Sequence, residues 1–287
     1  MRPPFLSRAA ASVPPHAWFL VSAVFHYLGP SFAVLLFPAV GVLGVAWFRI
    51  ASAAAVFAAW TRPWRVFRAA SRRLRVRLVL LGACLAAMNS VFYLAIDRLP
   101  LSLVATIEFV GMIAVAAYGL RSPRNHVALC MGAAGVFTLT GVHWANDPLG
   151  LAYAIANGVL FMAYIVLGHD IAREGAGEGV ERLGAAMAAA FVFVMPIGFA
   201  DAARSLTEPW LIAAGIGVGL CSSVVPYVCD QLAMSRLPRN TFALMLALLP
   251  ATATLIGALV LGQIPSARDL TGIALVMAGI ALHRPRG

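Results

Sequence analysis

The tripeptide Arg-Leu-Pro occurs twice, in Asn89-Ser-Val-Phe-Tyr-Leu-Ala-Ile-Asp-Arg-Leu-Pro100 and again at residues 236–238. An apolar stretch ending in a polar residue precedes each copy, and a small polar residue and a long apolar stretch follow it. Each half then closes with a charged turn and a Gly-rich apolar segment, at residues 135–141 and 272–279. This duplication predicts two related halves, residues 1–143 and 144–287.

The composition indicates a membrane protein. Of the 287 residues, 62% are hydrophobic and 11% are charged, and the mean hydropathy is +0.89. A soluble domain carries about 25% charged residues. Long uncharged apolar runs recur from end to end, which leaves no room for a soluble domain.

We expect an all-α membrane protein with ten transmembrane helices in two inverted five-helix repeats. Most apolar runs approach the length of about 20 residues that crosses the hydrocarbon layer. Since five is an odd number, a five-span half reverses the orientation of the half that follows it, as in many secondary transporters. The predicted spans are residues 16–37, 41–60, 77–96, 100–120, 126–143, 149–169, 183–203, 210–232, 239–262 and 268–283.

The arginines predict the orientation. All 21 basic residues are Arg, and 17 of them fall in segments that are cytoplasmic if the N-terminus is cytoplasmic, against three in the opposite loops. By the positive-inside rule, both termini therefore face the cytoplasm. The net charge of +10 lies in short linkers between apolar runs. There it suits anionic lipid headgroups, so we expect no nucleic-acid partner.

Arg49, Glu108 and Asp230 are charged residues inside apolar spans, where charge is costly and usually faces the bundle interior. Arg49 lies midway along the second span and would attract a substrate carboxylate; the alternative is a side chain that reaches an interface or pairs with a backbone carbonyl. Glu108 lies eight residues after Pro100, about 12 Å along a helix. A carboxyl group at that depth is suited to proton coupling or ammonium binding. Asp230 fits either the pocket or a solvated helix end.

Uncharged polar residues extend this set. Asn89 and Tyr93 share one face of the third span, and Tyr227 and Asp230 share one face of the eighth. Tyr164 lies in the second half of the sixth span. Each alone fits a hydrogen-bonded packing residue, but together they supply donors and acceptors for a small zwitterion. Nearby, Gly215-Ile-Gly-Val-Gly219 has the small-residue spacing that permits close helix packing.

Other classes of function lack support. The spans contain no His-Glu-x-x-His, no Ser/Lys or paired-Asp arrangement and no Gly-rich phosphate loop, so we expect no enzyme, no cofactor and no bound metal. A channel favours a continuous polar stripe or a ring of charges, and neither is visible. A channel or a non-transporting membrane protein remains an alternative, as does a carrier for another metabolite or a drug-like cation.

Several segments together resemble a known family. They are Met88-Asn-Ser-Val-Phe-Tyr-Leu-Ala-Ile-Asp-Arg-Leu-Pro-Leu101, Ile107-Glu-Phe-Val-Gly111, Val225-Pro-Tyr227, Ser235-Arg-Leu-Pro-Arg-Asn-Thr-Phe242 and Pro250. They look like the EamA-type transporters of the drug/metabolite transporter superfamily, and within it the threonine/homoserine exporter (RhtA-like) branch. The resemblance covers nearly the whole chain.

The resemblance implies a multi-pass protein of the bacterial inner membrane that exports small amino acids or related metabolites by proton exchange. It implies a substrate, protons and membrane lipids as partners, and it is compatible with a homodimer. Glu108 matches the acidic residue of the branch's fourth helix, and Asn89 and Tyr227 match polar positions of its third and eighth. The sequence departs from the branch at Leu249, where an acid is usual, at Met112, where a Pro is expected, and at Gln263, where Glu is common.

Overall fold

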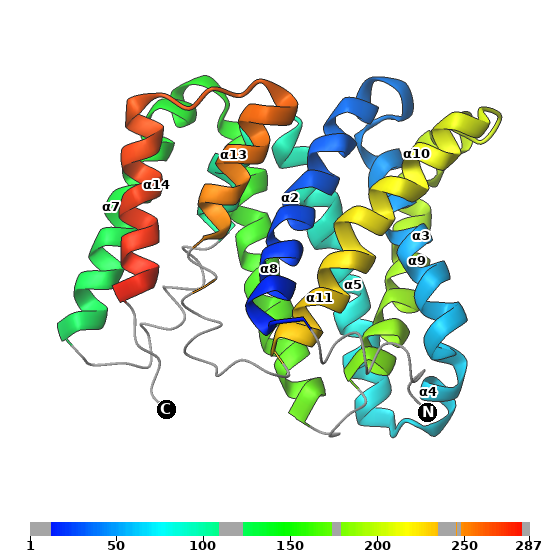
Figure 1. Ribbon diagram of the computed structural model, residues 1–287. Coiled ribbons are helices and arrows are strands. Elements are labelled where there is room, and N and C mark those ends of the chain that lie inside the picture. The colour runs from blue at the N-terminus through cyan, green and yellow to red at the C-terminus, as the bar shows by residue number, and fades with distance from the viewer. Residues whose placement is uncertain (1–12, 109–122, 174–178, 235–244, 246–247, 283–287) are drawn as a thin grey trace.

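The described part of the chain is helical. The computed structural model describes residues 13–108, 123–173, 179–234, 245 and 248–282, and over these ranges it contains helices, turns and short connections (Figure 1). The second Arg-Leu-Pro turn at 236–238 and residues 109–120 of the predicted fourth span lie outside these ranges. The named helices are α2 (Pro15–Val40), α3 (Val42–Thr61), α4 (Pro63–Ala69), α5 (Arg72–Ile96), α7 (Pro123–Asn146), α8 (Pro148–Arg173), α9 (Gly179–Ser205), α10 (Pro209–Gly219), the π-helix η1 (Leu220–Val224), α11 (Val225–Met234), α13 (Leu249–Leu261) and α14 (Ala267–Leu282).

Five helices are long and apolar enough to cross a membrane. In the described residues these are Pro15–Val40, Val42–Thr61, Arg72–Ile96, Gly179–Ser205 and Pro209–Asp230. They correspond to the first, second, third, seventh and eighth predicted spans. Two shorter apolar helices, Pro148–Tyr164 and Leu249–Leu261, fall within the sixth and ninth.

The outer surface carries large apolar side chains. Phe137, Val192 and Leu259 are 76%, 67% and 73% exposed. Exposed apolar patches of this kind mark membrane or protein contact surfaces. With the apolar helices, they identify a membrane-integral protein.

The basic segment between α3 and α5 differs from the prediction. The sequence predicts a basic loop at residues 62–77 and a span from residue 77, but Pro63 starts the short helix α4, and α5 begins at Arg72. Ser71 caps α5, because its Oγ accepts a hydrogen bond from the N–H of Leu74 at 3.2 Å. Capping of this kind extends a helix beyond its apolar run.

Helices of the two sequence halves are interleaved. In Figure 1, α7 and α14 lie side by side, and α3 packs along α9. α5 packs against α8 and α9, and α2 packs against α11 and α13. Polar residues that are distant in the sequence therefore meet in the interior of the bundle.

Candidate functional site

Arg49 is buried midway along α3, with 4% of its surface exposed. Its Nε donates a hydrogen bond to Oγ of Ser223 at 3.0 Å, and its Nη2 donates to the backbone carbonyl of Ser222 at 3.1 Å. The guanidinium carbon lies 5.3 Å from the ring centroid of Tyr93, a cation–π distance. Pairing with a carbonyl, one of the two alternatives from sequence, is thus observed. Nη1 nevertheless has no hydrogen-bond partner among the described residues.

The Ser222 carbonyl is available to Arg49 for a local reason. In an α-helix the N–H four residues later would bond to it, but that residue is Pro226, which has no N–H. The π-helix η1 ends two residues before this proline. Single-turn π-helices are rare and are frequent at functional sites. Because Pro226 has no N–H, the Ser222 carbonyl of the second sequence half can accept a hydrogen bond from Arg49 of the first half.

Two glycines allow α2 and α3 to approach this segment. A Cβ at Gly29 of α2 would lie 2.6 Å from the backbone nitrogen of Ser222. A Cβ at Gly219 would overlap the hydroxyl of Ser52 on α3 and lie 2.9 Å from the carbonyl oxygen of Arg49. The predicted close packing of the Gly-rich eighth span is therefore confirmed, with α3 as the neighbour.

Glu108 ends the described helical segment 101–108 and is 4% exposed. The charge of Arg49 acts on its carboxyl group, and the Asn157 side chain of α8 lies next to it. Tyr27 of α2 also lies within electrostatic reach of this carboxyl group. A Cβ at Gly158 would lie 3.7 Å from the Cα of Glu108, so α8 contacts this segment closely at this level.

Tyr227 connects this region to α11. It is 8% exposed and lies within electrostatic reach of both Arg49 and Glu108. Tyr164 of α8 lies beside Tyr227 and Asp230. Asp230 in turn faces Ser22, whose hydroxyl donates to the carbonyl of Pro226 at 3.2 Å.

We define the central cluster as Arg49, Tyr93, Glu108, Asn157 and Tyr227. It draws on α3, α5, α8, α11 and the segment 101–108, and thus on both sequence halves. Four of its buried polar atoms have no hydrogen-bond partner among the described residues: Arg49 Nη1, the Tyr93 hydroxyl and both side-chain amide atoms of Asn157. Buried polar atoms are normally paired, so such a concentration calls for an explanation.

The predicted residues separate into three groups. Arg49, Tyr93, Glu108 and Tyr227 meet in the central cluster. Tyr164 and Asp230 lie at its edge on α8 and α11. Asn89 is buried, but its Nδ2 donates to the carbonyl of Leu85 in its own helix at 2.7 Å.

The sequence analysis missed Ser222, Ser223 and Asn157. Asn157 was detectable, because it is an amide inside an uncharged apolar run. The serines gave no such signal on their own, since serines in helices commonly bond to a carbonyl one turn back. Ser222 does so with Val218. The one sequence signal near these two serines is Pro226, whose missing N–H leaves the Ser222 carbonyl without its usual helical donor.

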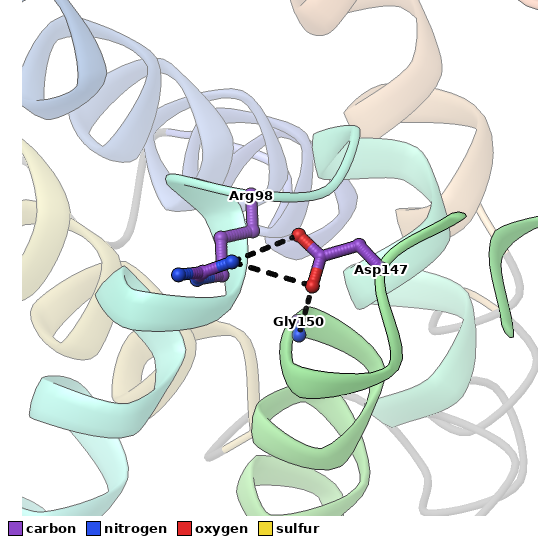
Figure 2. Close-up of polar contacts among 3 residues, drawn as sticks. All are labelled: Arg98, Asp147 and Gly150. Carbon is purple, nitrogen blue, oxygen red and sulfur yellow. Dashed lines mark hydrogen bonds and ion pairs between the residues drawn. The ribbon is translucent and has the colours of Figure 1, made fainter. Parts of the chain in front are cut away.

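A second polar site lies where the first Arg-Leu-Pro turn meets the start of α8. Figure 2 shows the Asp147 carboxylate between the Arg98 guanidinium and the N–H of Gly150. The Arg98 Nη1 to Asp147 Oδ2 distance is 3.2 Å, and the Gly150 N–H donates to Oδ1 at 2.8 Å. The Gly150 hydrogen bond, and then Arg98, lower the pKa of Asp147 below its usual value of 3.8. We call Arg98, Asp147 and Gly150 the loop cluster.

Another side chain joins the halves near the same turn. Gln263, which follows α13, accepts a hydrogen bond at Oε1 from the backbone N–H of Leu101 at 3.0 Å. It thereby satisfies one of the free N–H groups at the start of the helix that carries Glu108. Gln263, which stands where Glu is common in the branch, thus caps this helix with a neutral amide.

Comparison with known proteins identifies the family. The EamA-like transporter family model matches residues 148–283. The threonine/homoserine exporter RhtA of Escherichia coli K12 is 33% identical over 263 residues, covering 90% of this chain and 85% of that protein. The chain belongs to the EamA-like transporter family. RhtA of Salmonella typhimurium LT2 is 32% identical over 251 residues, covering 86% of this transporter and 82% of that protein.

A solved crystal structure shares the fold of this transporter. It superposes with a TM-score of 0.61 at 20% sequence identity, over 94% of this chain and 97% of the other. At that identity the likeness concerns the fold alone.

Proposed function

We propose that this transporter exports small amino acids of the threonine/homoserine kind, or a related metabolite, by proton-coupled alternating access. In this proposal the substrate binds in the central cluster between the two halves. The RhtA proteins, named as threonine/homoserine exporters, support the substrate class.

The observation that carries the proposal is the chemistry of the central cluster. A guanidinium with an unpaired Nη1 and a buried carboxyl group lie in one interior region. A zwitterionic amino acid presents a carboxylate and an ammonium group. The Arg49 guanidinium suits the carboxylate and the Glu108 carboxyl group suits the ammonium group.

Glu108 also suits proton coupling, because a carboxyl group can exchange its proton for a cationic group. In one half of the cycle the protein would change its open side with Glu108 protonated and no substrate bound. In the other, the ammonium group of the substrate would replace that proton. Tyr27 and Tyr227 lie within electrostatic reach of Glu108 and would assist the exchange.

The packing of the helices supports two related five-helix halves, residues 1–143 and 144–287. Numbered by predicted span, the third helix packs against the sixth and seventh, and the eighth packs against the first and second. If each helix of the first half is exchanged with the helix at the same place in the second half, the third becomes the eighth, and the sixth and seventh become the first and second. The first set of contacts then becomes the second set. The second helix packs along the seventh, and the fifth packs along the tenth. Each of these two pairs is unchanged by the same exchange. This pattern is typical of a pseudo-two-fold axis in secondary transporters.

For the orientation, we propose that both termini face the cytoplasm and that the loop cluster lies outside. Six arginines of the α4 region, from Arg62 to Arg75, are exposed at the opposite end of α5 from Arg98. Reporter fusions at both termini and within α4 test this directly. Cytoplasmic signals at all three agree with the proposal, and an external C-terminus contradicts the ten-span count.

The function is tested by uptake of labelled threonine and homoserine into proteoliposomes, with and without an imposed pH gradient. We expect saturable uptake that depends on the gradient. Flux that never saturates with concentration would instead indicate a channel. Absence of flux for both compounds, in protein shown to be folded, would reject this substrate class, and a metabolite screen including organic cations would follow.

A further inference from the structure

Asn157 has more unpaired capacity than any other side chain of the central cluster. It is fully buried, with 0% of its surface exposed; its Oδ1 has no hydrogen-bond partner among the described residues, and its Nδ2 has only the neighbouring Glu108 carboxyl group within reach. Leaving a buried amide unpaired is unfavourable, and replacing it by an apolar side chain would remove that penalty. A buried amide with this unpaired capacity therefore points to a partner that binds during the transport cycle.

The neighbours of Asn157 limit what that partner can be. Glu108 lies beside it, and Gly158 brings the backbone of α8 against the Cα of Glu108. A carboxylate would satisfy Nδ2 only and would be repelled by Glu108. An ammonium group would satisfy Oδ1 only. A hydroxyl group both donates and accepts, so one hydroxyl can satisfy both amide atoms.

We propose that Asn157 is a substrate-contacting residue that selects amino acids with a side-chain hydroxyl over apolar amino acids of the same shape. The inference rests on the proposed function, since it assumes that an amino acid occupies the central cluster. Arg49 and Glu108 then bind the carboxylate and the ammonium group that all amino acids share, and Asn157 hydrogen-bonds to the side-chain hydroxyl of the substrate.

The physical basis of this selection is the unpaired amide. A site built to hydrogen-bond a hydroxyl rejects the analogue that lacks it by about 10⁴-fold or more, whereas an apolar pocket separates similar groups by about 10- to 200-fold. The substrates for the test are two isosteric pairs, threonine with valine and homoserine with norvaline. Within each pair a hydroxyl group is replaced by a methyl group.

The experiment measures kcat/KM for the four amino acids in proteoliposomes with wild type, Asn157→Leu and a control. Leucine has nearly the shape of asparagine but makes no hydrogen bonds. The control is Thr106→Val, because Thr106 is equally buried, lies on the helical segment that carries Glu108, and bonds its hydroxyl to the Ser102 carbonyl of its own helix at 2.6 Å. Thermal unfolding of each purified variant is measured in parallel.

We expect wild type and Thr106→Val to favour threonine over valine by about 10⁴-fold or more. Asn157→Leu should reduce this preference to about 10-fold or less by losing threonine transport while keeping or gaining valine transport. Its unfolding temperature should be equal to or above that of wild type. If Asn157→Leu does not fold, Asn157→Ala takes its place.

Two results would overturn the proposal for Asn157 alone. One is wild-type threonine transport with an unchanged threonine-to-valine ratio in Asn157→Leu. The other is an equal loss for both amino acids, which would mean that Asn157 only positions Glu108. Folded wild-type protein that transports none of the four amino acids would instead overturn the proposed function and this inference together.

Discussion

The central cluster and the loop cluster both join the two sequence halves, but they treat their polar groups in opposite ways. In the loop cluster, the Asp147 carboxylate is used on both oxygens, by Arg98 and by the N–H of Gly150. In the central cluster, a guanidinium nitrogen, a phenol and a whole amide are buried without hydrogen-bond partners in the described residues.

On our proposal, the difference separates polar groups that stabilise the fold from polar groups that bind the substrate. A paired polar group near water stabilises a connection slightly and leaves nothing to bind a ligand. Unpaired groups in the interior destabilise the resting protein, and on our proposal a bound substrate pairs with them. Substitutions should therefore affect transport in the central cluster and stability in the loop cluster.

The largest effect is expected for Glu108→Gln. Glutamine keeps the size and the hydrogen-bonding capacity of the side chain but cannot exchange a proton. We expect proton-driven amino-acid uptake to fall to the level of empty liposomes while the protein stays folded. Uptake with and without a pH gradient, together with thermal unfolding in detergent, measures both quantities. Normal transport with unchanged pH dependence would remove Glu108 from the mechanism.

A smaller effect is expected for Arg49→Lys. Lysine keeps the charge but has a single ammonium group, which cannot reach Ser222, Ser223 and a substrate carboxylate together. A hydrogen bond to a charged group contributes about 1.5–3 kcal/mol, which corresponds to a rise of about 10- to 100-fold in KM. Concentration-dependent uptake gives KM and kcat separately. A KM equal to that of wild type would show that Arg49 serves only to hold η1 in place.

These two residues were predictable from sequence because a charge inside an apolar run needs no tertiary information to be recognised. Arg49 and Glu108 were found in this way, and the structure brings them together. The same criterion would have found Asn157 if it had been extended to amides. What the sequence could not supply is the pairing state of each group, since this depends on which helices of the other half lie opposite.

The fold was predictable to a similar extent. The apolar runs located α2, α3, α5, α9 and the α10–α11 segment, because hydrophobic length is a strong signal. The predicted start of α5 was wrong and helix α4 was not predicted. Ser71 and Pro63 begin these helices through local effects at the helix N-terminus, which hydropathy does not report. The π-helix was not foreseen, since an apolar run of a given length does not distinguish a π-helical turn from α-helix.

A moderate effect is expected for Pro226→Ala. Alanine supplies the N–H that proline lacks, and this N–H would compete with Arg49 for the Ser222 carbonyl. A neutral hydrogen bond contributes about 0.5–1.5 kcal/mol, so KM should rise by about 2- to 10-fold. Pro209→Ala is the matched control, because Pro209 lies at the start of α10, where its N–H would be free in any case. Equal effects of the two substitutions would mean that the freed carbonyl is not what holds Arg49.

The smallest effect on transport is expected for Asp147→Asn. The kinetic constants should stay at wild-type values, and the protein should unfold at a slightly lower temperature at pH 7. The sign follows from the lowered pKa of Asp147: the folded state favours the ionised carboxylate. Its contribution is therefore present above the ordinary pKa of 3.8 and is lost as the pH falls through the lower value of the folded protein. Thermal unfolding of both proteins between pH 7 and pH 3 should show the two curves converging toward the acid end. A difference that grows on acidification, or a loss of transport at pH 7, would show that the loop cluster contributes to transport and not only to stability.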